Sequence, residues 1–211
     1  MGLLGSIFGP SRSEIWAQVA ADIGATHVEG GWFGPGDGIR YRHGDWEIVL
    51  DSYTRNSSGS NGHSHSHTYT RMRAPFINAD GLRFEIYQES LFSGLGRLLG
   101  MQDIIIGDPV FDDAYVIKGN DEHQIRRLLD DPEVKRLISY QPDISLAIED
   151  DEGWFGPNFG DNVDQLRFTA SGSICDPGLL KDLFDLFATI LERLVAIDSA
   201  YEADPGVRLG T

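Results

Sequence analysis

The stretch DPGLLKDLFDLFATILERLVAIDSAY, residues 176–201, decides the fold class of this chain. Asp176 is a good helix N-cap and Pro177 fits a first turn, so the pattern predicts a helix over about 177–202. Its main apolar positions alternate by three and four residues: Leu180, Leu183, Phe187, Ile190, Leu194, Ile197 and Tyr201. Further apolar residues widen this stripe beyond a coiled-coil seam, as is typical of a helix lying across a sheet. A homodimer through this C-terminal helix is the alternative that the seam leaves open.

Segments of period-two alternation predict the strands of that sheet. In 39–50, a two-residue turn at His43-Gly44 would pair Tyr41 with Trp46 and Arg40 with Glu47. A third hairpin is predicted from DISLAIE (143–149) and QLRFTAS (165–171).

The middle hairpin is predicted over YTRMRAPFINADGLRFEIYQE, residues 69–89. An odd-numbered loop keeps apolar residues together, because it pairs Phe76 with Leu82, Met72 with Ile86, and Arg73 with Glu85. The polar tract NSSGSNGHSHSH (56–67) before it reads as a long mobile loop.

Three shorter helices complete the pattern. Ser11 to Glu14 is a capping box that opens a helix over about 12–23, and Gly24 ends it. Asn120 is predicted to cap a helix through Leu129, and Pro132 to restart it.

These elements predict an α+β fold: an antiparallel meander sheet with helices packed on one face and a long C-terminal helix. We expect residues 1–11 to form an N-terminal strap, 12–203 a single domain and 204–211 a tail. An internal pseudo-repeat of 12–118 and 119–203 is an open alternative.

Composition and charge exclude several functions. The formal charge is -16 and the pI about 4.6, so nucleic acid would be repelled over most of the surface. Residues 1–106 hold 11 acids and 8 bases, whereas 107–211 hold 22 acids and 9 bases, so an anionic partner would approach the first half. The single cysteine, Cys175, cannot form an internal disulfide, and no run is long and apolar enough to span a bilayer, which favours a cytoplasmic protein.

The N-terminal residues 1–9, MGLLGSIFG, fit a myristoylation pattern and carry four large apolar side chains. We interpret them as a strap on the domain or a loose end, with weak membrane-surface contact as the alternative.

The pentapeptide GWFGP occurs twice, at 31–35 and 153–157. Gly-Pro is turn chemistry, and the pentapeptide holds no titratable group, nucleophile or metal ligand. We interpret both copies as turns covered by aromatic side chains. If they bind anything, Trp32, Phe33, Trp154 and Phe155 are the candidate partner-binding residues, because exposed aromatic rings anchor partners.

Three alternating histidines, His63, His65 and His67, are the candidate metal ligands. Their Ser, Gly and Asn neighbours indicate a solvated loop that binds metal weakly. Glycines 94–100 lack the spacing of a nucleotide-binding loop, and the acids at 108–113 and 149–152 lack calcium-loop spacing, so no cofactor is expected.

The stretch GDPVFDDAYVIKGNDEHQIRRLLDDPEVKRLI (107–138) resembles uncharacterised bacterial proteins related to the domain of unknown function numbered 3137. The matching residues are Gly107, Asp108, Pro109, Phe111, Asp112, Gly119 and Asp121. The family has no assigned activity, so the resemblance implies no catalytic residue.

The sequence therefore predicts a noncatalytic binding module for a protein or a membrane-peripheral partner. The alternatives are a carrier of a small apolar ligand held between the sheet and the C-terminal helix, and a metal-dependent hydrolase that uses the three histidines.

Overall fold

The structure, a computed structural model, describes residues 9–30, 36–58, 64–88, 101–150 and 159–210. The helices of these residues are α1 (Arg12–Ile23), α2 (Pro109–Ala114), α3 (Glu122–Leu129), α4 (Pro132–Tyr140) and α5 (Pro177–Ala196). The strands are β1 (Thr26–Val28), β2 (Gly38–His43), β3 (Trp46–Ser58), β4 (Ser64–Asn78), β5 (Phe84–Tyr87), β6 (Gln102–Asp103), β7 (Val116–Gly119), β8 (Ser145–Glu149), β9 (Val163–Ser171) and β10 (Ala200–Tyr201).

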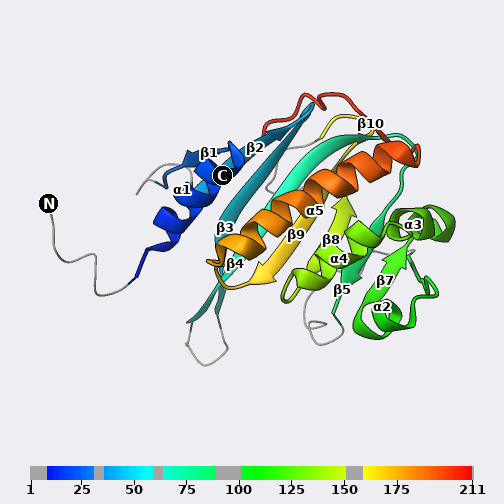
Figure 1. Cartoon of the computed structure of the whole chain (residues 1–211), viewed down its shortest axis with the longest axis horizontal. Helices are drawn as coiled ribbons and strands as arrows, with labels where there is room; N and C mark the ends of the chain where they lie inside the picture. Colours follow the sequence, from blue (N-terminus) through cyan, green and yellow to red (C-terminus); the bar gives the residue numbers. More distant parts are fainter. Residues whose placement is uncertain (1–8, 31–35, 59–63, 89–100, 151–158, 211) are drawn as a thin grey trace, which may run out of the picture.

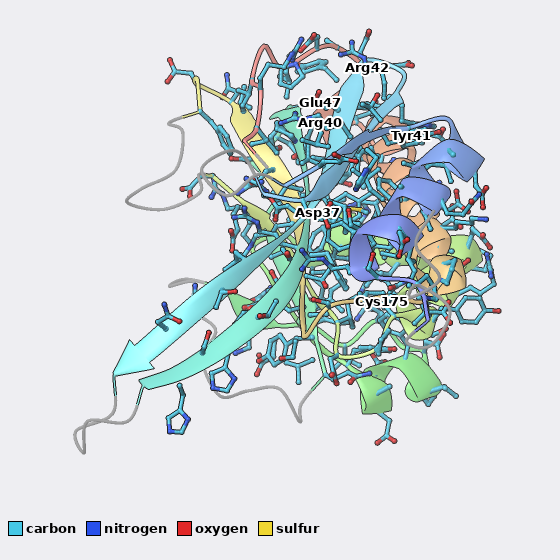
Figure 2. The ribbon with its side chains drawn as sticks, turned by 90° about the vertical axis from the view of Figure 1, so that its left-hand side faces the viewer. Asp37, Arg40, Tyr41, Arg42, Glu47 and Cys175 are labelled. Carbon is cyan, nitrogen blue, oxygen red and sulfur yellow. The ribbon has the colours of Figure 1, made fainter. Side chains whose placement is uncertain are left out.

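The strands form one antiparallel sheet in the order β1-β2-β3-β4-β9-β8-β5-β7-β6, and β10 pairs with β4. Figure 1 shows α5 lying across this sheet, and Figure 2 shows the helices gathered on one side of it. The predicted α+β class is confirmed. The meander runs from β1 to β4, after which the β8–β9 hairpin inserts between β4 and β5.

The helix α5 supplies much of the core, as its wide apolar stripe predicts. Leu180, Leu183, Phe187, Ile190 and Leu194 are all 0% exposed, and they belong to one cluster with side chains from the sheet. A dimer through α5 would therefore have to use the polar side of this helix, and it stays a prediction.

The predicted end of this helix is wrong. The helix stops at Ala196, Asp198 adopts a left-handed conformation with φ 67°, and Tyr201 pairs with Ile77 as part of β10. Helical periodicity continues past the break because Ile197 still points into the core, where it is 1% exposed.

The first hairpin has a two-residue turn, as predicted, but the turn lies one residue later in the chain. The turn is Gly44-Asp45, so Tyr41 pairs with Ile48 and His43 with Trp46. The reason is backbone conformation, since Gly44 has φ 55° and the preferred two-residue hairpin turn requires a positive φ there. The residue opposite each β2 position is two residues later than predicted, so every side chain stays on the predicted face of the sheet.

The predicted middle hairpin does not form. Met72, Arg73 and Phe76 of β4 pair with β9, and β5 lies between β8 and β7. A turn held by Asn78, which accepts from the Gly81 amide at 2.9 Å and donates to the Leu82 carbonyl at 3.0 Å, separates the two strands. The predicted pairs Phe76–Leu82, Met72–Ile86 and Arg73–Glu85 are therefore wrong, because the partners of both strands come from later in the chain.

Residues 56–58 and 64–67 of the polar tract are strand, contrary to the loop prediction, and 59–63 lie outside the described residues. The β3–β4 ladder includes Arg55 opposite His67 and Asn56 opposite Ser66. Backbone hydrogen bonds hold such a ribbon without apolar side chains. The predicted cap of α3 also moves by one residue, since Asp121 caps the helix while Asn120 accepts from the Arg83 amide.

Candidate functional site

The side of the sheet opposite the helices carries a row of mostly charged residues, which the strand register places side by side. From β2 to β7 the row reads Arg40, Val49, Arg73, Arg167, Ala147, Glu85 and Lys118. We call it the charged row. The sequence could not show this row, because it depends on the β4–β9 and β5–β8 pairings.

Asp51 organises the middle of this face. Arg71 binds both carboxylate oxygens of Asp51 at 2.9 Å, and Arg73 binds one of them. Asp51 and Arg73 are each 1% exposed. Burial lowers the pKa of Arg73 to about 10, with Arg71 and Arg40 adding to the effect and Asp51 opposing it. The arginine therefore stays charged at neutral pH, held by one buried carboxylate.

The C-terminal segment crosses this part of the sheet. The carbonyl of Leu209 accepts from Arg40 and that of Gly210 accepts from Arg73 at 2.6 Å, while Leu209 is 2% exposed. Figure 2 shows the segment running along the side of the sheet opposite the helices. It covers the β2–β4 end of the charged row, so Arg40 and Arg73 serve stability there.

Farther along the row, Arg167 of β9 pairs with Glu149 of β8. The Nε of Arg167 and the Oγ1 of Thr169 are buried and have no hydrogen-bond partner among the described residues. Burial raises the pKa of Glu85, against the opposing effect of Lys118.

The β3–β4 ribbon continues beyond the sheet as a projecting element. Pairing of β3 with β2 ends at Asp51, and pairing of β4 with β9 ends at Tyr69. We call residues 52–58 and 64–68 the arm; Figures 1 and 2 show it extending away from the helices and from the rest of the sheet. At its base the rings of Tyr53 and Tyr69 stack with centroids 5.3 Å apart, and the Arg71 guanidinium lies 5.1 Å from the Tyr53 ring centroid.

The two faces of the arm differ in chemistry. Tyr53, Tyr69, Arg55, His67 and His65 share one face, which is the face of the charged row. Hydroxyl and amide side chains occupy the other: Thr54, Thr68, Asn56 and Ser66. Arg55, His65 and His67 are exposed. This face, which we call the basic face, is therefore accessible and combines an arginine and two histidines with aromatic rings.

The charge of this region is opposite to that of the whole chain. The described residues of the arm contain one arginine, Arg55, and two histidines, His65 and His67, but no aspartate or glutamate. In a chain of formal charge -16, this makes the arm the natural contact for an anionic group.

A separate pocket of about 430 Å³ lies at the turn that follows β4. Its lining includes Asn78, Arg83, Asp150, Asn162 and Asp164. Arg83 pairs with Asp164 at 3.1 Å and with Asp150 at 3.0 Å, and burial raises the pKa of Asp164. Arg83 is shared by the two carboxylates, and Asp164 also accepts from Asn78, so the pocket is a polar cleft whose lining is internally hydrogen-bonded.

A histidine–aspartate cluster near the start of β2 could not be predicted from the sequence either, because its members come from separate elements. His27 Nε2 lies 2.8 Å from Asp37 Oδ1, and Ser13 Oγ donates to the same oxygen at 3.3 Å. The serine bonds to the carboxylate and not to the imidazole, so the cluster lacks the base–nucleophile contact of a catalytic triad. Arg12 completes it as an ion pair with Asp37 at 3.3 Å.

The aromatic residues and one histidine predicted as binding sites, Trp32, Phe33, Trp154, Phe155 and His63, lie outside the described residues. The two segments that contain GWFGP join β1 to β2 and β8 to β9, and both pairs are antiparallel neighbours. The turn interpretation stays a prediction.

The described candidate ligands, His65 and His67, point from the same side of β4. Within the described ranges, no group of three or more His, Cys, Asp or Glu side chains is placed to hold a metal ion. Two acids of the 107–113 signature have structural roles: Asp108 caps α2, and Asp112 accepts from the amides of Ile106 and Gly107 at 2.9 Å.

The space between the sheet and α5, which is the predicted place for an apolar ligand, is lined by packed side chains. Leu50, Met72 and Phe168 on the strands and Phe187 on α5 are all 0% exposed. Among the described helices, none has both the length and the apolar character needed to cross a membrane.

Comparison with known proteins gives one structural likeness. The chain is similar to the crystal structure of the mycobacterial trehalose monomycolate transport factor A, TtfA, with a TM-score of 0.51 and 7% sequence identity over 87% of this chain and 94% of that chain. This similarity concerns the fold. No family model matches the chain, and no curated protein matches it. The resemblance to proteins related to the domain of unknown function 3137 stays a prediction.

Proposed function

We propose that this chain is a noncatalytic binding protein that contacts an anionic partner, a protein or a membrane-peripheral assembly, through its arm. The observation that carries the proposal is the basic face formed by Arg55, His65 and His67 on a projecting ribbon, within a chain of formal charge -16. A cationic element on an acidic protein attracts anionic partners and rejects most others, because the rest of the surface repels them. The fold shared with a transport factor is in keeping with a binding role.

A second contact is proposed at the aromatic turns. Trp32 and Trp154 belong to connections between antiparallel neighbours, and exposed rings at such turns anchor partners. Alanine at both positions should reduce partner capture with little change in melting temperature. A large loss of stability would instead place these rings in the core. The proposed setting is the cytoplasm, in keeping with the single cysteine.

The test of the proposed function is site-specific photo-crosslinking in the native host. A photoreactive residue at Thr54, which is exposed next to Arg55, should capture a defined partner, and the same residue at Arg136, an exposed arginine on α4, should not. The partner is then purified and its affinity measured directly for the wild type and for the triple variant Arg55→Gln, His65→Gln, His67→Gln.

The expected result is weaker binding by the triple variant and a strong salt dependence in the wild type, since exposed charge contacts are screened by salt. Arg136→Gln is the matched control, because it removes one exposed cation from the helix side. Equal affinities for the wild type and the triple variant would show that the arm is not the binding element.

A further inference from the structure

The arm has open backbone edges as well as a charged face. The pairing of β3 with β2 stops at Asp51, and no described residue pairs with the outer edge of β3 from Ser52 to Ser58. An open strand edge presents a row of unpaired amides and carbonyls, which is a template for a further strand.

The register identifies which residues present these groups. The two-residue turn at Gly44-Asp45 makes His43–Trp46 a hydrogen-bonded pair, and hydrogen-bonded pairs then recur at every second residue along β3. Counting onward, Thr54 and Asn56 direct their amides and carbonyls toward the outer edge, whereas Tyr53 and Arg55 direct theirs toward β4. The same alternation on β4 directs the backbone groups of Thr68 away from β3, and the Thr68 carbonyl does accept from the Gly172 amide on that side, at 2.8 Å.

We propose, resting on the proposed function, that the partner is an extended acidic peptide segment that adds as a strand to the outer edge of β3 along Thr54–Ser58. Such a strand directs every second side chain to the face that carries Tyr53 and Arg55. Asp or Glu at those alternate positions lies next to Arg55, with the histidines of β4 one strand farther away, about 5 Å. The backbone bonds supply affinity, and the alternating carboxylates supply specificity.

Charge also accounts for what the edge rejects. Arg55 on this edge strand disfavours pairing between identical copies, because it would face the same charge on the second copy. The same charge favours an acidic strand. A membrane surface is less suited to this arm: its described exposed side chains, Thr54, Arg55, Asn56, His65, Ser66 and His67, include no apolar group to insert. The open backbone would gain no partner in the lipid.

The test uses the full chain and a fluorescein-labelled nine-residue peptide in which Glu alternates with Thr, measured by fluorescence anisotropy at low salt. Asn56→Pro removes one outward amide without breaking the β3–β4 ladder, since proline is tolerated on the solvent side of an edge strand. Asn56→Ala keeps the amide. Ser66→Pro is the matched control, because Ser66 lies opposite Asn56 and directs its amide to the other edge of the ribbon, away from β3.

We expect Asn56→Pro to weaken peptide binding about tenfold or more, and Asn56→Ala and Ser66→Pro to stay within about twofold of the wild type. N-methylation of every second peptide residue on the pairing edge should abolish binding, and a peptide with Lys in place of Glu should not bind. Hydrogen exchange should show new protection at the amides of Thr54 and Asn56.

Two results would overturn the inference while leaving the proposed function in place. In the first, Asn56→Pro binds the peptide as the wild type does, while the Gln triple variant does not. In the second, vesicles of phosphatidylserine and phosphatidylcholine bind in an Arg55-dependent way while the peptide does not bind. If neither probe binds and the crosslinked partner is also indifferent to the triple variant, the proposed function itself fails.

Discussion

Tyr53 and Tyr69 face each other across β3 and β4, with ring centroids 5.3 Å apart and an interplanar angle of 19°. The pair lies where the ribbon leaves the sheet, and Arg55 and Arg71 approach the Tyr53 ring at 5.8 and 5.1 Å. Beyond the pair the described part of the arm is held by its own ladder and carries polar side chains, so this stacked pair supports the base of the projecting element.

The tyrosine pair should therefore hold the arm in place. Tyr53→Ala, Tyr69→Ala and the double variant should give a coupling of about 0.5–1.5 kcal/mol in the free energy of unfolding, in keeping with aromatic pairs elsewhere. Native-state hydrogen exchange should show lost protection confined to the arm amides. A coupling near zero would mean that the ladder alone supports the arm.

The buried pair of Asp51 and Arg73 should dominate the stability of the face opposite the helices. Asp51→Asn leaves Arg73 without its carboxylate at 1% exposure, and removing one partner of a buried ion pair costs about 3–5 kcal/mol. Glu47→Gln is the control, because it removes the partly exposed Arg40–Glu47 pair and should cost about 1 kcal/mol or less. Urea unfolding of both variants checks this; equal losses would contradict it.

The stability of the chain should carry a pH signature from Glu85. Burial raises the pKa of this carboxyl above its ordinary value near 4.5, so the folded state takes up the proton first as the pH falls. The contribution of Glu85 to the free energy of unfolding therefore rises as the pH falls through the raised pKa toward 4.5, and it falls again as the pH rises.

Glu85→Gln removes that dependence. The variant should be more stable than the wild type at pH 7, and the difference should close near pH 4, measured by urea unfolding across the range. Asp113→Asn, a change at an exposed carboxyl, should show no such convergence. A constant difference at all pH values would show that the effect of Glu85→Gln is packing and not charge.

Gly119 should tolerate no side chain. An added Cβ would lie 2.0 Å from the Ile125 Cδ1 and 3.0 Å from the Arg83 carbonyl oxygen. Gly119→Ala should cost about 1–3 kcal/mol, the usual penalty of overpacking a core. At Gly160 an added Cβ meets nothing within 4 Å, so Gly160→Ala should stay within about 0.5 kcal/mol of the wild type. Thermal unfolding of the two variants compares them, and similar melting temperatures would show that Ile125 moves aside at little cost.

The local part of the structure was predictable from the sequence. The capping box at Ser11, the Asp176-Pro177 start of α5 and the wide stripe of that helix depend on neighbours within a few residues, and each appears as expected. The α+β class followed from the same stripe, because a helix with so broad an apolar face needs a sheet to cover it. The excess of base over acid in residues 52–79 was also present in the composition.

The tertiary structure alone decided the sheet order and hence the binding surface. Arg73 was expected opposite Glu85, yet it lies opposite Arg167, whose strand begins some 85 residues after β4 ends. Pairing between such distant strands is set by the packing of the whole core, and local alternation specifies only which face a side chain takes. In the same way, His65 and His67 were visible as residues, but their common face with Arg55 and the open edge of β3 exist only because the ribbon continues beyond its neighbours.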